Sequence, residues 1–189
     1  MIPLAVDVAD RDVLVVGMGL VGAHKAHLLI DAGARVHVIS DAVRAPLPEG
    51  VTSLRRRKYR SGDAVGYFLV VSATGDDEVN DLIVVDAART GTLLNVVDDP
   101  SRCGFYFTSV HRDGDVIVSV STSGASPSLA QWIRRRVQEV LPTGLGQVAA
   151  ALRMERAILH ARGESTEVDW SGRVEVLVQD LAQDPQNPS

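Results

Sequence analysis

Apolar and polar positions along the first hundred residues alternate in a pattern that predicts strands and helices in turn. Short, uninterrupted apolar runs rich in valine and isoleucine are typical of strands buried on both faces of a parallel sheet. Between them, apolar residues recur at helical spacing, and Gly33 stands where a helix ends with a glycine. The expected strands are residues 13–16, 36–39, a short one near 52–54, 67–71 and 93–97, and the expected helices are 20–32 and 76–90.

The pattern changes near residue 104. Two runs of β-branched and aromatic residues, 105–110 and 116–120, flank Asp113-Gly114, which predicts a hairpin. Ser126-Pro127 then opens a helix with proline at its first position. That helix is expected to run to about residue 140, and further helices are expected over 146–161 and 174–182.

The order of elements predicts an α/β protein. Strands that alternate with helices indicate a Rossmann-like parallel sheet, which we assign to residues 1–103. A smaller α+β region over 104–145 follows, and then a C-terminal helical region over 146–189. Its last residues, from Asp184 onward, are expected to form a frayed tail.

A glycine motif follows the first predicted strand and opens the first predicted helix: Gly17-Met18-Gly19-Leu20-Val21-Gly22. In this context Gly17 allows a tight turn, Gly19 lets a pyrophosphate approach the backbone, and Gly22 lets the helix pack closely on the strand. The motif therefore predicts a dinucleotide cofactor at the helix N-terminus. The alternative is that these glycines serve packing only.

Ser40 and Asp41 stand at the end of the second predicted strand. A carboxylate at this place accepts hydrogen bonds from the adenosine ribose and repels a 2′-phosphate, so Asp41 favours NAD over NADP. A solvated aspartate in a turn is the competing interpretation, and the sequence leaves both open.

A second carboxylate position follows the strand at 93–97, in the run Asn95-Val96-Val97-Asp98-Asp99-Pro100. Ligands of open α/β sheets bind at the carboxyl ends of the strands, and an aspartate there can act as a general base. On residue type alone, a turn aspartate ahead of a proline explains Asp98 as well.

Composition narrows the classes of function. The formal net charge is -5, which argues against binding to nucleic acid through a basic surface. A single cysteine, Cys103, allows no disulfide framework within the chain and fits a reducing compartment. We see no signal peptide, no membrane span and no spacing typical of structural zinc, and we expect a cytoplasmic protein.

Four segments together resemble the precorrin-2 dehydrogenase / sirohydrochlorin ferrochelatase family, in a form without a methyltransferase domain. They are residues 15–26, 72–80, 95–100 with Cys103 and Phe105, and 121–130. The first is shared with many dehydrogenases, and the last two are much more specific.

The resemblance implies oxidation of precorrin-2 to sirohydrochlorin with NAD, and it leaves ferrous iron insertion open. It also implies a homodimer whose second region dimerises and completes the cleft. Asp98 matches the family's catalytic aspartate. The implied cofactor-binding residues are Gly17, Gly19, Leu20, Val21, Gly22, Ser40, Asp41, Ala73 and Thr74. The implied substrate-binding residues are Asn95, Arg112, Ser121, Thr122, Ser123, Gly124 and Ser126.

The sequence departs from the family's pattern at Gly22, where the family often has alanine, at Thr108, where it usually has proline, and at Ser123, where it usually has glycine. Some members carry a regulatory phosphoserine at the position of Thr122, a role we do not transfer. Arg102 and Arg112 are candidates for binding the carboxylates of a tetrapyrrole.

The alternative function is a non-catalytic NAD-sensing regulatory module. Such a module would need the glycine motif but neither 95–100 nor 121–130.

Overall fold

The computed structural model describes residues 2–183, and the expected frayed tail at 184–189 lies outside the described residues. Contacts group the chain into two units, residues 1–106 and 107–189. The three predicted regions and their boundaries stay predictions.

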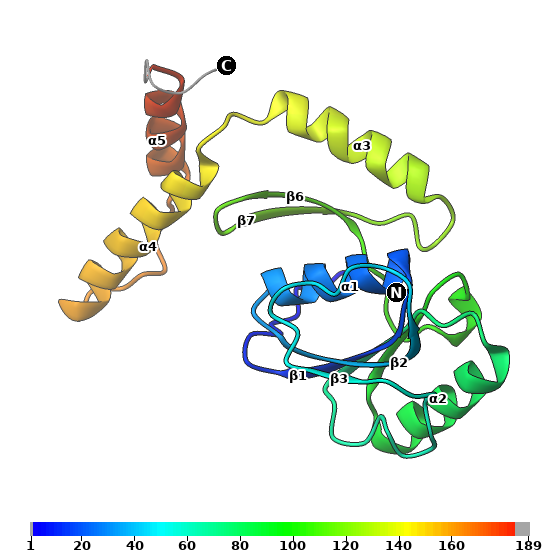
Figure 1. Cartoon of the computed structure of the whole chain (residues 1–189). Helices are drawn as coiled ribbons and strands as arrows, with labels where there is room; N and C mark the ends of the chain where they lie inside the picture. Colours follow the sequence, from blue (N-terminus) through cyan, green and yellow to red (C-terminus); the bar gives the residue numbers. More distant parts are fainter. Residues whose placement is uncertain (1, 184–189) are drawn as a thin grey trace. The chain divides into compact units, whose positions relative to one another are not determined.

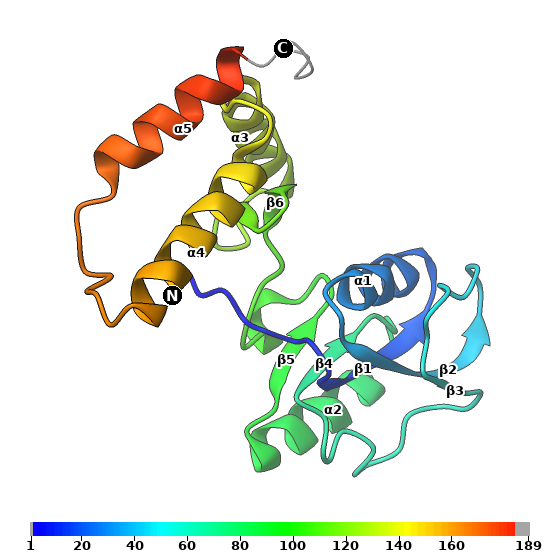
Figure 2. The same cartoon turned by 90° about the vertical axis from the view of Figure 1, so that its left-hand side faces the viewer.

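The first unit is a five-stranded, all-parallel sheet in the order β3-β2-β1-β4-β5. This order, with β1 and β4 as central neighbours, is that of a Rossmann-like fold, as predicted. Helices α1 and α2 cover opposite faces of the sheet (Figures 1 and 2). The strands are β1 Asp12–Met18, β2 Arg35–Val43, β3 Ser53–Arg55, β4 Leu69–Ser72 and β5 Leu93–Val96, and the helices are α1 Leu20–Asp31 and α2 Asp77–Thr90.

The core lies where the apolar runs predict it. Residues 13–16 of β1 and all four residues of β4 are buried, so these strands are covered on both faces. On one face, Leu14 and Val16 belong to the same buried cluster as Val79, Ile83 and Ala87 of α2. Asp76 caps α2 by accepting a hydrogen bond from the Val79 amide, which agrees with the predicted helix start.

Strand β2 is longer than predicted. It continues to Val43, so Ser40 and Asp41 lie inside the strand rather than at its end. The register between β1 and β2 shifts between Val16 and Met18, and Met18 pairs again with Val43. The shift coincides with Gly17, whose φ of 93° takes the chain out of the extended conformation. The pattern of apolar residues does not predict that β2 continues to Val43 after this shift in register.

The second unit begins with the predicted hairpin, β6 Ser109–Asp113 and β7 Val116–Val120, and continues with three helices. Helix α3, Pro127–Val140, packs against the hairpin, and α4 and α5 pack on each other (Figures 1 and 2). Asp113 Oδ2 accepts hydrogen bonds from the amides of Gly144 and Leu145, which attaches the hairpin turn to the start of α4. The last two helices are α4 Leu145–Ala161 and α5 Ser171–Gln183, and a short 3-10 helix, η1 Pro100–Arg102, follows β5 in the first unit.

Candidate functional site

The glycine loop joins β1 to α1 at the carboxyl edge of the sheet. Gly17 has a positive φ, and a Cβ atom there would lie 2.6 Å from the Ala73 carbonyl oxygen. A Cβ atom at Gly22 would overlap the carbonyl oxygen of Gly17. Two of the three motif glycines are therefore required by close packing inside the protein, between the loop, α1 and the segment after β4.

Gly19 has a different reason to be glycine. It is the N-cap of α1, no side chain caps that helix end, and a Cβ atom at Gly19 would meet nothing within 4 Å. The first amides of a helix lack partners within the helix, so they are available to an anion. The open space at Gly19 and these amides fit the pyrophosphate of a dinucleotide.

A cavity at this edge of the sheet joins several cofactor candidates. Gly17, Ser40, Asp41 and Thr74 line it, and Ala73 lies next to Thr74. Leu20 and Val21 are exposed at the start of α1. The structure thus brings these candidates to one edge of one sheet.

Ser40 has a structural task that the sequence did not reveal. Its side chain is buried, accepts a hydrogen bond from the Met18 amide at 3.1 Å and donates one to the Ala42 carbonyl. Asp41 is exposed beside it. Because the Ser40 hydroxyl already bonds to backbone groups of β1 and β2, Asp41 is the better placed of the two to meet a ribose.

The same cavity is lined by Arg57, Lys58 and Tyr59, which sequence reasoning missed. Lys58 Nζ lies 3.4 Å from Asp76 Oδ2, and Arg57 is paired with Asp63. The available signal was the basic run that directly follows the short strand β3. Only the tertiary pairing of β3 with β2 brings this run to the cavity, so the run by itself does not indicate a role there.

Asp86 of α2 holds this segment in place. Its carboxylate, buried in the first unit, accepts hydrogen bonds from the Tyr59 hydroxyl and the Gly62 amide, both at 2.6 Å. The Tyr59 hydroxyl in turn accepts one from the Ala64 amide. Burial, and then the hydrogen bond to Asp86, raise the pKa of Tyr59 well above its usual range, so the hydroxyl stays a donor.

Tyr59→Phe is expected to lower the free energy of unfolding by about 1–3 kcal/mol, because it leaves buried groups short of a partner. Urea denaturation measures this effect. Tyr67→Phe is the matched control, since the Tyr67 ring makes an edge contact with His37 that the substitution keeps. Equal stability of the two variants would contradict the role given to the Tyr59–Asp86 hydrogen bond.

Asp98 lies in the turn that follows β5. It is exposed and adopts a left-handed conformation, with φ of 62°. Strands β4 and β5 are parallel neighbours, so this turn belongs to the same carboxyl edge as the glycine loop. Asn95 is buried, and its Nδ2 donates to the Phe105 carbonyl at 3.0 Å, which ties β5 to the segment after η1.

The remaining substrate candidates belong to the second unit. Arg112 is exposed on β6, and the loop between β7 and α3 forms a turn bonded to itself. Helix α3 begins at Pro127, as the Ser126-Pro127 pair predicts, and Ser126 caps it by accepting from the Leu129 amide. The Thr122 hydroxyl bonds to the backbone of Ser126. Ser123 and Gly124 have positive φ values, and Ser121 accepts from the Ser123 amide. Their binding roles stay predictions.

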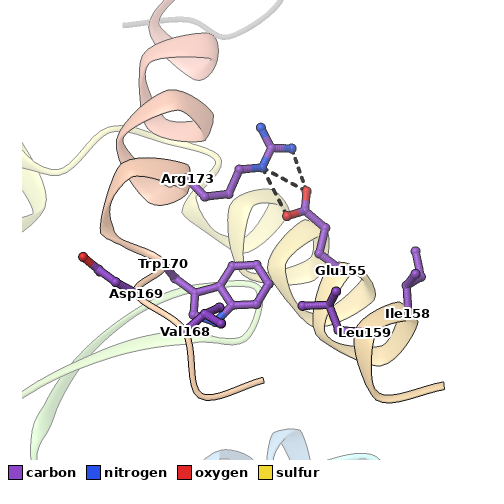
Figure 3. Close-up of a pocket in the computed structure, with 7 residues that line it drawn as sticks. All are labelled: Glu155, Ile158, Leu159, Val168, Asp169, Trp170 and Arg173. Atoms are coloured by element: carbon purple, nitrogen blue, oxygen red, sulfur yellow. Dashed lines mark hydrogen bonds and ion pairs between the residues drawn. The ribbon is translucent and has the colours of Figure 1, made fainter. Parts of the chain in front are cut away.

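A second hollow lies between α4 and α5 (Figure 3). It has a volume of about 420 Å³ and is mostly apolar, with the Glu155–Arg173 ion pair at one side. None of the candidate residues lines this hollow.

Within residues 2–183, no cluster of three or more His, Cys, Asp or Glu side chains is arranged to hold a metal ion. No described helix is long and apolar enough to cross a membrane.

The parallel sheet, its strand order and the glycine loop at a helix N-terminus define a dinucleotide-binding α/β protein. A family model described as "Putative NAD(P)-binding" matches residues 4–109. The chain belongs to this family, which agrees with the predicted NAD cofactor and covers the glycine loop and Asp98.

The sequence similarity to other proteins extends beyond the first unit. The chain is 38% identical over 152 residues to a siroheme synthase of Methylococcus capsulatus and 39% identical over 150 residues to one of Ectopseudomonas mendocina. Each alignment covers 78% of this chain and 32% of the relative, so the chain spans about a third of the length of these relatives. A solved structure of SirC, a precorrin-2 dehydrogenase, has a TM-score of 0.71 at 25% identity, and the match covers 99% of this chain and 92% of that one. The family resemblance inferred from the four segments is confirmed.

Proposed function

We propose that the protein oxidises precorrin-2 to sirohydrochlorin with NAD. The observation that carries this proposal is the placement of Asp98, in a left-handed turn at the sheet edge that also bears the glycine loop. The similarity to SirC over nearly the whole chain supports the same activity.

The proposed roles follow from the geometry. The amides at the start of α1 and the open space at Gly19 hold the pyrophosphate, and Asp41 accepts from the ribose, which favours NAD over NADP. When bound, NAD supplies the acceptor for a hydride. Asp98 takes the proton that leaves the macrocycle. Asn95, Arg112 and the loop at 121–126 are proposed to orient the substrate.

The protein is also proposed to act as a homodimer through its second unit. A two-stranded hairpin is marginally stable by itself, and here one face is covered by α3. The other face exposes Val110 and Ile117, which are 44% and 46% exposed. Val110 and Ile117 share this face with their cross-strand neighbours Ser119 and Arg112, so the face is part apolar and part polar. A second copy is the partner that the proposed family role requires.

Ile117→Asp is expected to shift this dimer to monomers, because it places a charge in an apolar contact. Sedimentation equilibrium measures the mass. Leu47→Asp is the matched control, since Leu47 is an exposed apolar residue of the first unit and 41% exposed. A wild-type protein that sediments as a monomer would refute the dimer.

Ferrous iron as a second substrate belongs to the same proposal, because the relatives are called siroheme synthases. A cytoplasmic location is proposed on the grounds of the single cysteine.

One experiment tests the function directly. Purified protein, NAD and precorrin-2 are mixed anaerobically, and the expected result is the sirohydrochlorin spectrum with matching formation of NADH. Fe²⁺ is then added to sirohydrochlorin to test chelation. NAD binding without turnover would overturn the dehydrogenase proposal in favour of an NAD-sensing module.

A further inference from the structure

Arg102 makes an unusual set of contacts beside the turn of Asp98. Its three guanidinium nitrogens each pair with a different carboxylate: Nη1 with Asp77 at 3.0 Å, Nη2 with Asp81 at 2.9 Å and Nε with Asp99 at 3.3 Å. The first two carboxylates come from the start of α2, and the third comes from the residue next to Asp98. The Arg102 side chain is 27% exposed. These ion pairs give its nitrogens partners within the protein, which argues against its predicted use for substrate carboxylates.

The charges show what Arg102 stabilises. Asp77 and Asp81 are four residues apart on α2, so they lie on one face of the helix and repel each other. Hydrogen bonds from Ser101, and then the charge of Arg102, keep the pKa of Asp99 below its usual value. Asp99 therefore adds a third negative charge to the site. Arg102 offsets part of the repulsion among these carboxylates, and each exposed pair contributes little by itself.

The backbone of Asp98 needs such support. A left-handed conformation costs a non-glycine residue roughly 1–2 kcal/mol and persists where the surroundings impose it. The Asp99 carboxylate accepts from the amide and hydroxyl of Ser101, and the Cys103 thiol bonds to the Val96 and Asp99 carbonyls. These contacts shape the segment itself. The Arg102 pairs with Asp77 and Asp81 attach this segment to the start of α2. Cys103 also packs against the buried cluster that contains Val79, Ile83 and Ala87 of α2.

We infer that Arg102 is a positioning residue, which holds the turn of Asp98 against the start of α2. Helix α2 begins directly after Asp76, which with Thr74 lines the cavity proposed for the cofactor. Arg102 thereby sets the distance between the proposed base and the nucleotide. The inference rests on the proposed function in giving Asp98 that role.

Arg102→Gln is expected to lower kcat about 10- to 100-fold, which is the usual cost of a displaced catalytic group, while KM for NAD changes less than twofold. Arg102→Lys keeps one charge without the planar fork and should recover part of the loss. Asp81→Asn removes one of the three pairs and serves as a milder variant. Arg89→Gln, at the exposed last turn of α2, is the control and should match the wild type.

A double-mutant cycle separates positioning from general stability. Because Arg102 acts through Asp98, Arg102→Gln should cause no further loss in an Asp98→Asn background. If the double variant has a kcat lower than that of Asp98→Asn by the factor that Arg102→Gln causes alone, the inference is overturned.

Hydrogen exchange gives a readout that does not need turnover. In Arg102→Gln, the amides of residues 97–103 should exchange faster, and those of the glycine loop should keep their wild-type rates. If wild-type protein shows no turnover, the proposed function fails, and exchange still decides whether Arg102 anchors the turn. Unchanged exchange at 97–103 would refute that anchoring in either case.

Discussion

Asp98→Asn is expected to reduce the oxidation of precorrin-2 by about a hundred- to ten-thousandfold and to leave the affinity for NAD unchanged. Asparagine removes the base but fits the same space. It also tolerates the left-handed conformation that the turn requires at this position. The loss can therefore be assigned to the missing proton acceptor and not to a rebuilt turn.

Anaerobic single-turnover absorbance gives the rate, and fluorescence titration gives the affinity for NAD. Glu49→Gln is the control, because it removes another exposed carboxylate from the same unit. Unchanged rates in Asp98→Asn would remove Asp98 from the mechanism. Lost rates together with lost NAD binding would indicate a structural role instead.

Gly19→Asp is expected to weaken NAD binding by about a hundredfold or more with little loss of stability. A Cβ atom at Gly19 meets no protein atom within 4 Å, so the fold accepts a side chain there. The carboxylate would point into the space proposed for the pyrophosphate, where two like charges cost several kcal/mol.

Two further substitutions in the glycine loop separate the effects of charge, bulk and packing. Gly19→Ala adds bulk without charge and should weaken binding less. Gly22→Ala should lower stability, because its Cβ would overlap the Gly17 carbonyl oxygen. Isothermal calorimetry measures binding, and thermal unfolding measures stability. Wild-type affinity in Gly19→Asp would contradict the assignment of the loop.

Much of the site was predictable because its signals are local. The glycine motif, the helix start at Asp76 and the cap at Ser126 each depend on residues within a few positions of one another. The position of Asp98 was also predictable, since a carboxylate after a buried parallel strand reaches the ligand edge in any such sheet, and its catalytic role stays a prediction. The predicted use of Arg102 for substrate carboxylates stays a prediction, and its ion pairs with Asp77, Asp81 and Asp99 argue against it.

The partners of buried or paired polar groups were not predictable. Ser40 bonds to Met18, Asp86 to Tyr59, and Arg102 to Asp77, across 22, 27 and 25 positions of sequence. The segment at 57–59 reaches the cavity lined by Gly17, Ser40, Asp41 and Thr74 only because β3 pairs with β2. Neither spacing nor residue type contains that information.

Apolar periodicity and glycine placement alone specify the α/β class, the order of elements and the site of the cofactor, because burial and backbone freedom act along a few consecutive residues. Only the tertiary structure decides that Gly19 faces open space and that Asp86 accepts a hydrogen bond from Tyr59. It also decides that Arg102 pairs with Asp99, the residue next to Asp98. Hydrogen bonds and ion pairs join whatever the fold brings within about 3 Å, and that proximity exists only once the sheet has formed.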